Sequence, residues 1–151
     1  MKPLIVLIVT FLISLLFLYF FRGQYELALS GRIAMSVMLA FTSLGHFLYT
    51  KGMTMMIPDF IPFKKLMVYL TGIFETATAI GLQISTIWQL TGWALIVFFV
   101  IMLPANINAA IKKVDYQKET LGGSGINYLW FRIPLQVIFI LWVYYFTLYL
   151  R

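Results

Sequence analysis

Five polar side chains that can donate, accept or exchange a proton stand inside otherwise apolar segments of the chain. They are His46, Glu75, Asn106, Arg132 and Gln136. Glu75 is the most costly of them to bury, because it lies at the centre of the apolar segment VYLTGIFETATAIGL, residues 68–82. An unpaired carboxylate in hydrocarbon costs several kcal/mol or becomes protonated. Glu75 therefore needs a partner.

Arg132 is the predicted partner of Glu75, because it is the only cation that falls inside a predicted span on a matching side of the chain. His46 is the second choice. We expect an ion pair between Glu75 and Arg132. His46, Asn106 or Gln136 would bridge it.

Helical spacing brings polar residues onto common faces. At ~100° per residue, one stripe lies within about 40° of a single line; its members are Arg32, Ser36, Ser43, His46 and Thr50. Arg132 and Gln136 are four residues apart and share a face. These faces predict one intramembrane cavity, open toward the cytoplasmic half, that binds a ligand through the five residues. Arg32 lies outside it, at the far end of its stripe.

Each of these residues also has a structural interpretation. The Glu75–Arg132 pair could fix helix register, or it could handle a ligand or a proton, which is the default expectation for charges within a membrane. His46 is a proton relay, a hydrogen-bond donor to a ligand, or a residue at the capped end of its helix. Asn106 follows Pro104 and can satisfy the carbonyl that the proline frees. One histidine and one carboxylate are too few to predict a metal site.

Composition places the chain among integral membrane proteins. Of its 151 residues, 62% are hydrophobic and 11% charged, and the mean hydropathy is +0.95. A water-soluble fold could not cover that much apolar surface. The absence of cysteine excludes thiol chemistry by the chain itself, and one histidine excludes bis-histidine haem ligation. The net charge of +6 indicates contact with lipid head groups and not with nucleic acid.

Five segments are long enough to span a bilayer, which takes ~20 apolar residues per helix. They cover residues 3–21, 32–50, 66–84, 87–111 and 126–150. The first is expected to be retained, since its apolar run exceeds the ~7–15 residues of a signal peptide and no small-x-small site follows closely. The fold class is therefore all-α: one membrane domain, residues 1–151, built as a bundle of five transmembrane helices.

Lysine and arginine in the loops predict the orientation. One side collects Lys2, Lys51, Lys64, Lys65, Lys112, Lys113 and Lys118. The other side has Arg22, Arg32 and Arg151. The excess places the amino terminus, the 51–65 loop and the 112–125 loop in the cytoplasm of a cell-membrane protein. The apolar 51–65 loop is expected to lie in the interface or to fold back over the bundle as a lid, and 112–125 to be a flexible solvent loop.

Several short motifs, in order, resemble the DoxX-like family of small membrane proteins. They are GHF at 45–47, IPDFIP at 57–62, YLTGIFE at 69–75, AIGL at 79–82, LPAN at 103–106 and RIPLQ at 132–136. The resemblance implies a four-helix core in spans two to five, to which the first span is an addition. Some DoxX-type proteins are subunits of a thiosulfate:quinone oxidoreductase, which implies a pocket for a quinone. A related animal branch assists the assembly of membrane receptors.

The sequence thus leads to two functional hypotheses. In the first, the chain binds a small lipid-like molecule such as a quinone, as a non-catalytic membrane subunit beside a membrane or peripheral redox partner. In the second, it is an assembly factor or scaffold for membrane proteins, and the Glu75–Arg132 pair is structural. A small transporter is a weaker third, because five helices around one narrow cavity give no obvious alternating access.

Overall fold

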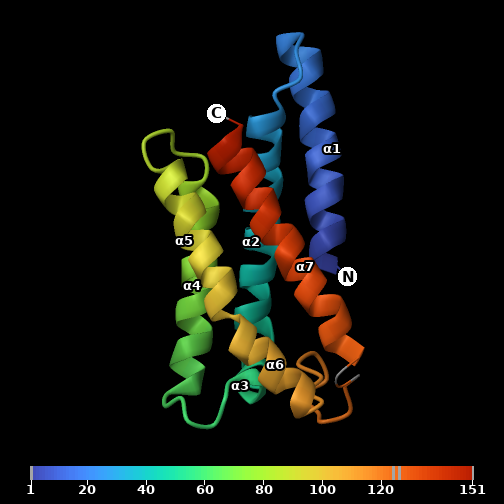
Figure 1. Cartoon of the computed structure of the whole chain (residues 1–151), viewed down its shortest axis with the longest axis vertical. Coiled ribbons are helices and arrows are strands. Elements are labelled where there is room, and N and C mark those ends of the chain that lie inside the picture. Colours follow the sequence, from blue (N-terminus) through green and yellow to red (C-terminus); the bar gives the residue numbers. More distant parts are fainter. Residues whose placement is uncertain (1, 124, 126, 151) are drawn as a thin grey trace.

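The computed structural model describes residues 2–123, 125 and 127–150. Within them the fold is a bundle of long helices without a β-strand, as the all-α prediction requires (Figure 1). The elements are α1 (Lys2–Arg22), α2 (Leu27–Leu48), α3 (Thr50–Met56), α4 (Lys64–Gly81), α5 (Trp88–Ile101), α6 (Leu103–Ile111), α7 (Asn127–Val143) and the π-helix η1 (Tyr144–Tyr149).

In the described part of the chain, four helical segments are long and apolar enough to cross a membrane. They are Lys2–Arg22, Leu27–Leu48, Trp88–Ile111 and Leu129–Tyr149. These correspond to the predicted first, second, fourth and fifth spans, although residue 126, where the fifth was predicted to begin, lies outside the described residues. The predicted third span coincides with α4, which is apolar to a lesser degree because Lys64, Lys65 and Glu75 fall among its 18 residues.

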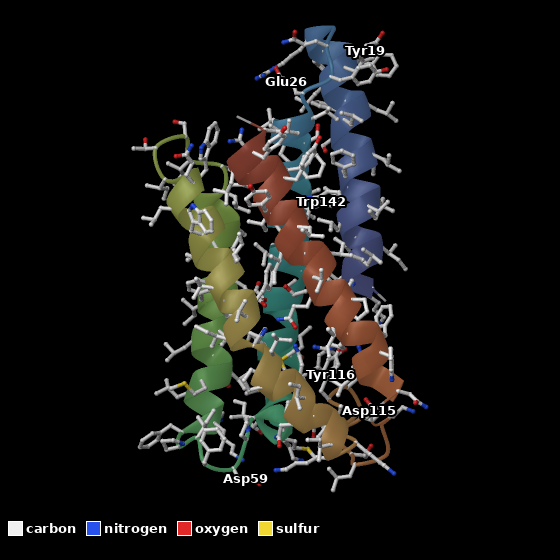
Figure 2. The ribbon with its side chains drawn as sticks, in the orientation of Figure 1. Tyr19, Glu26, Asp59, Asp115, Tyr116 and Trp142 are labelled. Atoms are coloured by element: carbon white, nitrogen blue, oxygen red, sulfur yellow. The ribbon has the colours of Figure 1, made fainter. Side chains whose placement is uncertain are left out.

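α2 lies in the middle of the bundle, with α1 packed along one side and α4 along the other (Figure 1). α1 is shifted along the bundle axis, so that its end at Arg22 projects beyond the other helices. Figure 2 shows Glu26 near that end and Asp59 near the opposite end. Antiparallel neighbours of this kind follow from short connections between long helices.

The core is a continuous apolar cluster that runs through the interior of the bundle. Its fully buried members are Leu7, Met35, Met38, Leu39, Leu82, Leu95 and Val143. Small residues let helices approach closely at the edges of this core. A Cβ on Gly31 would lie 2.2 Å from the ring of Phe146, and one on Gly92 would lie 3.0 Å from Thr147.

The predicted fourth span is broken into α5 and α6 at Met102. Pro104 has no N–H to donate, so it begins a new helix and does not continue the old one. Pro134 lies inside α7, and α7 passes into the π-helix η1, whose Leu150 N–H bonds the Tyr145 carbonyl at 2.9 Å.

The loop predicted as a lid contains a helix. α3 packs against α6 through Met56, Ala109 and Val114. The Asn108 amide donates to the Met56 carbonyl at 2.7 Å, and Gly52 lies against the backbone of Tyr116. The first part of this segment is therefore anchored beneath the bundle. The rest, residues 57–63, ends at Phe63 in the left-handed region with φ 53°.

The loop predicted as flexible, 112–125, has a backbone turn in its described part. Asp115 and Thr120 exchange two backbone hydrogen bonds, of 2.8 and 3.2 Å. The Asp115 carboxylate also accepts from the backbone N–H groups of Gln117 and Lys118. These bonds give the turn a defined geometry that composition alone does not indicate. Residue 124 lies outside the described residues.

Candidate functional site

Glu75 is buried in the interface between α4 and α2, with 8% of its surface exposed. Its Oε2 accepts a hydrogen bond from the Thr42 hydroxyl at 2.9 Å, and its Oε1 lies 3.5 Å from Nε2 of His46. Thr42 and His46 are four residues apart on α2, so one helix face supplies both contacts. The carboxylate therefore has two polar neighbours in place of water.

The contacts of Nδ1, the second ring nitrogen of His46, indicate which ring nitrogen carries a proton. Nδ1 lies 3.1 Å from the Val68 carbonyl and 3.0 Å from the Thr71 hydroxyl. A carbonyl can only accept, and the Thr71 hydroxyl has other carbonyls in reach, so Nδ1 is assigned as the donor to Val68. Nε2 is then the nitrogen that faces Glu75.

His46 and Glu75 are close enough to interact directly, with 3.5 Å between Nε2 and Oε1. A ring protonated at Nε2 would face an ionised Glu75 as an opposite charge. A protonated Glu75 would face the bare Nε2, which can only accept. Either arrangement would leave the pair neutral overall, the inexpensive state for two ionisable groups in a low-dielectric interior.

The predicted ion pair between Glu75 and Arg132 is wrong, because Glu75 has a different partner. Among the described residues, the ion-pair contact of Glu75 is His46, the second choice from sequence. The reason is helix packing: α4 packs mainly along α2, whereas α7 packs along α5 and α6. Glu75 is on α4 and Arg132 is on α7, so the two residues belong to different helix interfaces despite their opposite charges.

The three remaining predicted residues form a second polar cluster. Nη1 of Arg132 donates to Oδ1 of Asn106 at 2.6 Å, and Nδ2 of Asn106 donates to Oε1 of Gln136 at 3.2 Å. The Gln136 amide in turn donates to the Phe99 carbonyl. Thus Gln136, and not Asn106, satisfies a carbonyl next to the helix break. The cluster joins α5, α6 and α7.

The five predicted residues therefore occupy two places and not one cavity. The first is the His46–Glu75 pair between α2 and α4, and the second is the Asn106–Arg132–Gln136 cluster between α6 and α7. None of the five lines either of the two surface grooves described next.

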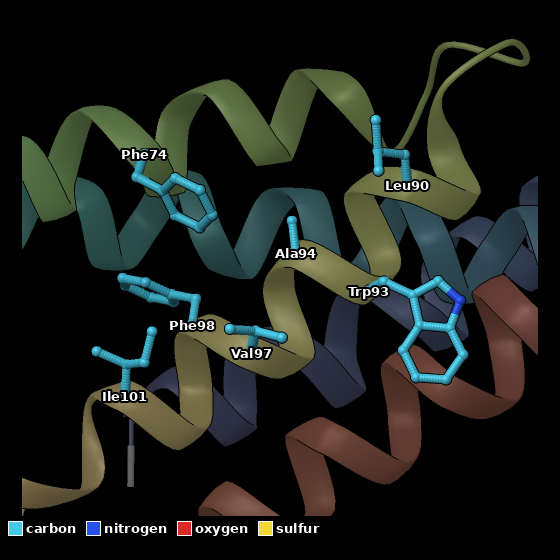
Figure 3. Close-up of a pocket in the computed structure, with 7 residues that line it drawn as sticks. All are labelled: Phe74, Leu90, Trp93, Ala94, Val97, Phe98 and Ile101. Carbon is cyan, nitrogen blue, oxygen red and sulfur yellow. The ribbon is translucent and has the colours of Figure 1, made fainter.

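The first groove is apolar, with a volume of about 400 Å³, and lies between α4 and α5 (Figure 3). It is lined by Phe74, Leu90, Trp93, Ala94, Val97, Phe98 and Ile101. Phe74 precedes Glu75 directly on α4, so the groove and the His46–Glu75 pair are placed by the same turn of helix. Its lining fits a hydrocarbon chain, and of these side chains only that of Trp93, through its indole N–H, has a hydrogen-bonding group.

The second groove, of about 690 Å³, lies at the lysine-rich end, and charged side chains form part of its lining. Asp59 joins two helices there, with its carboxylate 2.6 Å from Nζ of Lys64 and 2.6 Å from Nζ of Lys112. The two ammonium groups lower the pKa of Asp59 to about 2, and Lys112 has the larger effect. The sequence predicted the loop but not this three-residue link.

The residues predicted for the site include neither Thr42 nor Thr71. Thr42 lies outside the polar stripe, but it stands four residues before His46, and that spacing was the available signal. Thr71 is four residues before Glu75 on α4 in the same way. Ser36 adds a further polar contact to the α2–α4 interface, donating to the Ala79 carbonyl at 2.7 Å.

Fold and site together define a class: a small all-helical membrane protein whose helix interfaces bury hydrogen-bonded polar groups. The chain belongs to the family described as Domain of unknown function (DUF8561), whose model matches residues 35–147. The match begins within α2, so it contains all five predicted site residues and leaves out α1. No curated protein and no solved structure matches the chain.

Proposed function

We propose that the chain binds a small lipid-like molecule with a hydrogen-bonding head group, the quinone class being the best fit. The observation that carries the proposal is the contact of 3.5 Å between Nε2 of His46 on α2 and the buried Glu75 carboxylate on α4. Such a pair can donate to a carbonyl or accept from a hydroxyl without an unpaired charge, which is what the oxidised and reduced forms of a quinone require.

The apolar groove between α4 and α5 supports a tail site for the same molecule. It is open to the lipid side of α5, where Trp93 and Val97 are exposed. A ligand tail lying against Phe74 would bring its head group to the turn of α4 that carries Glu75. In this proposal the Asn106–Arg132–Gln136 cluster stabilises the α5–α6 break and does not contact the head group.

The proposed role is that of a non-catalytic membrane subunit beside a membrane or peripheral redox partner. A quinone accepts two electrons and two protons, and the His46–Glu75 pair offers a route for protons only. Electrons would come from the partner protein. The DoxX-like motifs are a further support, because they include His46, Glu75 and the RIPLQ segment of α7.

The proposal includes five spans and a cytoplasmic amino terminus. α4 has 18 residues, which at ~1.5 Å each reach about 27 Å, close to the ~30 Å of a hydrocarbon core. Lys64 and Lys65 stand in its first turn, where long side chains reach the interface. Glu75 is then the only charged residue in the interior of α4, and α2 supplies its contacts.

The test compares the wild type with Glu75→Gln in lipid nanodiscs. Retained small molecules are identified by mass spectrometry, and a short-tailed ubiquinone is titrated into both proteins. We expect the wild type to bind the quinone and Glu75→Gln to lose at least about tenfold in affinity, which corresponds to one hydrogen bond to a charged group. Glu119→Gln, the same change in an exposed carboxylate paired with Lys51, is the matched control.

A folded Glu75→Gln variant that binds the quinone as the wild type does would overturn the ligand role. The assembly-factor hypothesis is favoured by a separate observation, the large exposed side chains of Phe20, Phe21 and Trp130. It predicts that substitutions in these residues reduce recovery of co-purifying membrane proteins while Glu75→Gln does not. Unfolding of Glu75→Gln would favour a purely structural pair.

A further inference from the structure

Arg32 is a buried cation that forms no ion pair among the described residues, although Glu26 attracts it electrostatically. It lies on α2 with 8% of its surface exposed, and its Nε has no hydrogen-bond partner. No ion pair joins it to a carboxylate in the described part of the chain, whereas the more exposed Arg22 has one. A buried guanidinium without an acceptor is costly, because it has five N–H donors to satisfy.

The acidic side chains of the chain are all engaged elsewhere. There are five: Glu26 with Arg22, Asp59 with Lys64 and Lys112, Glu75 with His46, Asp115 with backbone N–H groups, and Glu119 with Lys51. Glu26 stands at the start of the same helix, but Gln24 also bonds its carboxylate. Glu26 thus attracts Arg32 only from a distance, and in the described part of the chain no carboxylate accepts a hydrogen bond from its guanidinium.

Trp88 holds the guanidinium in one orientation. The central carbon of the group lies 3.4 Å from the centre of the Trp88 ring, at the first turn of α5. Stacking of this kind is favourable but uses only the face of the group. The edge, where the N–H donors point, is left for an acceptor in the plane. A planar, oriented fork of donors is the geometry that binds an oxyanion through two parallel hydrogen bonds.

The position of Arg32 along α2 is suited to a lipid phosphate. It is the sixth residue of the helix, about 7.5 Å from its first residue at ~1.5 Å per residue. That end of the bundle also carries the connection between α4 and α5 and the end of η1 (Figure 1). A guanidinium one to two turns below a helix end reaches the head-group layer.

We propose that Arg32, oriented by Trp88, is a binding site for one phosphate group. The group is either the phosphodiester of an anionic phospholipid or a soluble phosphate, and the chemistry of recognition is the same for both. The site lies at the opposite end of α2 from His46, so the proposal is independent of the quinone proposal above.

Calorimetric titration of the full chain in a neutral detergent tests the site with two probes. One is dihexanoyl-phosphatidylglycerol, and the other is inorganic phosphate. The variants are Arg32→Gln and Arg32→Lys, and Arg22→Gln is the matched control at the same end of the molecule. We expect binding of one probe by the wild type, a loss of at least about tenfold in affinity in both Arg32 variants, and less than about twofold in Arg22→Gln.

The two probes separate the sources of the phosphate. Arg32-dependent binding of phosphatidylglycerol alone assigns the site to a lipid, and Arg32-dependent binding of inorganic phosphate assigns it to a soluble ligand. Absence of binding, or equal losses in Arg32→Gln and Arg22→Gln, overturns the proposal. If Arg32→Gln does not fold, the affinity of Arg32→Lys tests the proposal instead. Lysine keeps the positive charge but lacks the planar fork of N–H donors and the stacking on Trp88.

Discussion

At the scale of single residues, Gly72 controls how closely α4 can approach His46. A Cβ built on Gly72 would lie 2.8 Å from Cβ of His46 and 3.4 Å from the ring of Phe47. The first of these distances is too short for real Cβ contacts, so a side chain at Gly72 must push α4 away from α2. That displacement would lengthen the contact between His46 and Glu75, which already measures 3.5 Å.

Gly72→Ala is therefore expected to destabilise the bundle by about 1–3 kcal/mol, the usual cost of inserting one methyl group into a packed interface. It should also weaken quinone binding if the pair contacts the head group. The measurement is the free energy of unfolding in detergent, followed by circular dichroism. Gly45→Ala is the control, because its Cβ would meet only the flexible end of Met53, at 3.4 Å.

The opposite order of stabilities, with Gly45→Ala the weaker protein, would show that the α2–α4 distance is not limited by Gly72. A glycine-to-alanine change inside a helix otherwise tends to stabilise it by about 1 kcal/mol, so the two variants should differ in sign as well as in size.

Residue types predicted the buried polar groups better than they predicted the contacts among them. Arg132 and Gln136, which their spacing placed on one face, do join one cluster with Asn106. Glu75, however, contacts His46 and not Arg132. Sequence shows which residue on a helix is costly to bury, but the choice between two partners depends on which helices touch, and that is a property of the whole packing arrangement.

At the scale of elements, Asp59 ties the start of α4 to the end of α6. The carboxylate accepts from Lys64 in the first turn of α4 and from Lys112 directly after α6. Both contacts are at the surface, so they stabilise through attraction that depends on pH and salt. All three residues of the link line the second groove.

The pH dependence of this link has a definite sign. The pKa of Asp59 falls from 3.8 to about 2 in the folded protein, so the link stabilises fully above pH 3.8. The stabilisation is lost as the pH falls through about 2. The difference in thermal midpoint between the wild type and Asp59→Asn should therefore be constant near about pH 6 and shrink toward zero near about pH 2.

Salt provides the control for the Asp59 experiment. At about 1 M salt the screening length is ~3 Å, so the difference between the wild type and Asp59→Asn should shrink at every pH. A difference that persists unchanged at low pH and at high salt would mean that Asp59 acts by packing or by a turn hydrogen bond and not by charge.

Helices were predictable from sequence where the apolar run was long. They were not predictable where local backbone geometry sets the type or the start of the helix. The ends of the first two spans fall within a few residues of α1 and α2. α3 was missed because a seven-residue helix rich in methionine gives no periodic signal of its own. The break at Met102 was indicated by Pro104, but the change from α7 to a π-helix at Tyr144 has no counterpart in the residue pattern.

At the scale of the whole molecule, the number of crossings decides on which side each loop lies. Four segments qualify as spans by length and composition, and α4 is the proposed fifth. With five, the two ends of the chain lie on opposite sides of the membrane. With four, the loop after α6 changes sides.

The absence of cysteine makes a direct test of topology possible. Single cysteines at three exposed loop positions, Gln24→Cys, Ser85→Cys and Lys118→Cys, are labelled in intact cells with an impermeant maleimide. We expect labelling of Gln24→Cys and Ser85→Cys from outside, and of Lys118→Cys only after permeabilisation, because positively charged loops stay in the cytoplasm. Labelling of Lys118→Cys from outside would mean that α4 does not cross.

The four-residue turn between α1 and α2 has a consequence for how the protein is made. Two helices so closely joined and packed along each other can enter the membrane during synthesis as one hairpin. The turn of that hairpin lies between Arg22 and Glu26, which form an ion pair of 3.2 Å. Because the two charges cancel, little net charge would cross the bilayer with the turn. Since the family match starts only at residue 35, α1 lies outside the matched domain although it packs along α2, and a hairpin that enters as one unit would tie the orientation of α2 to that of α1.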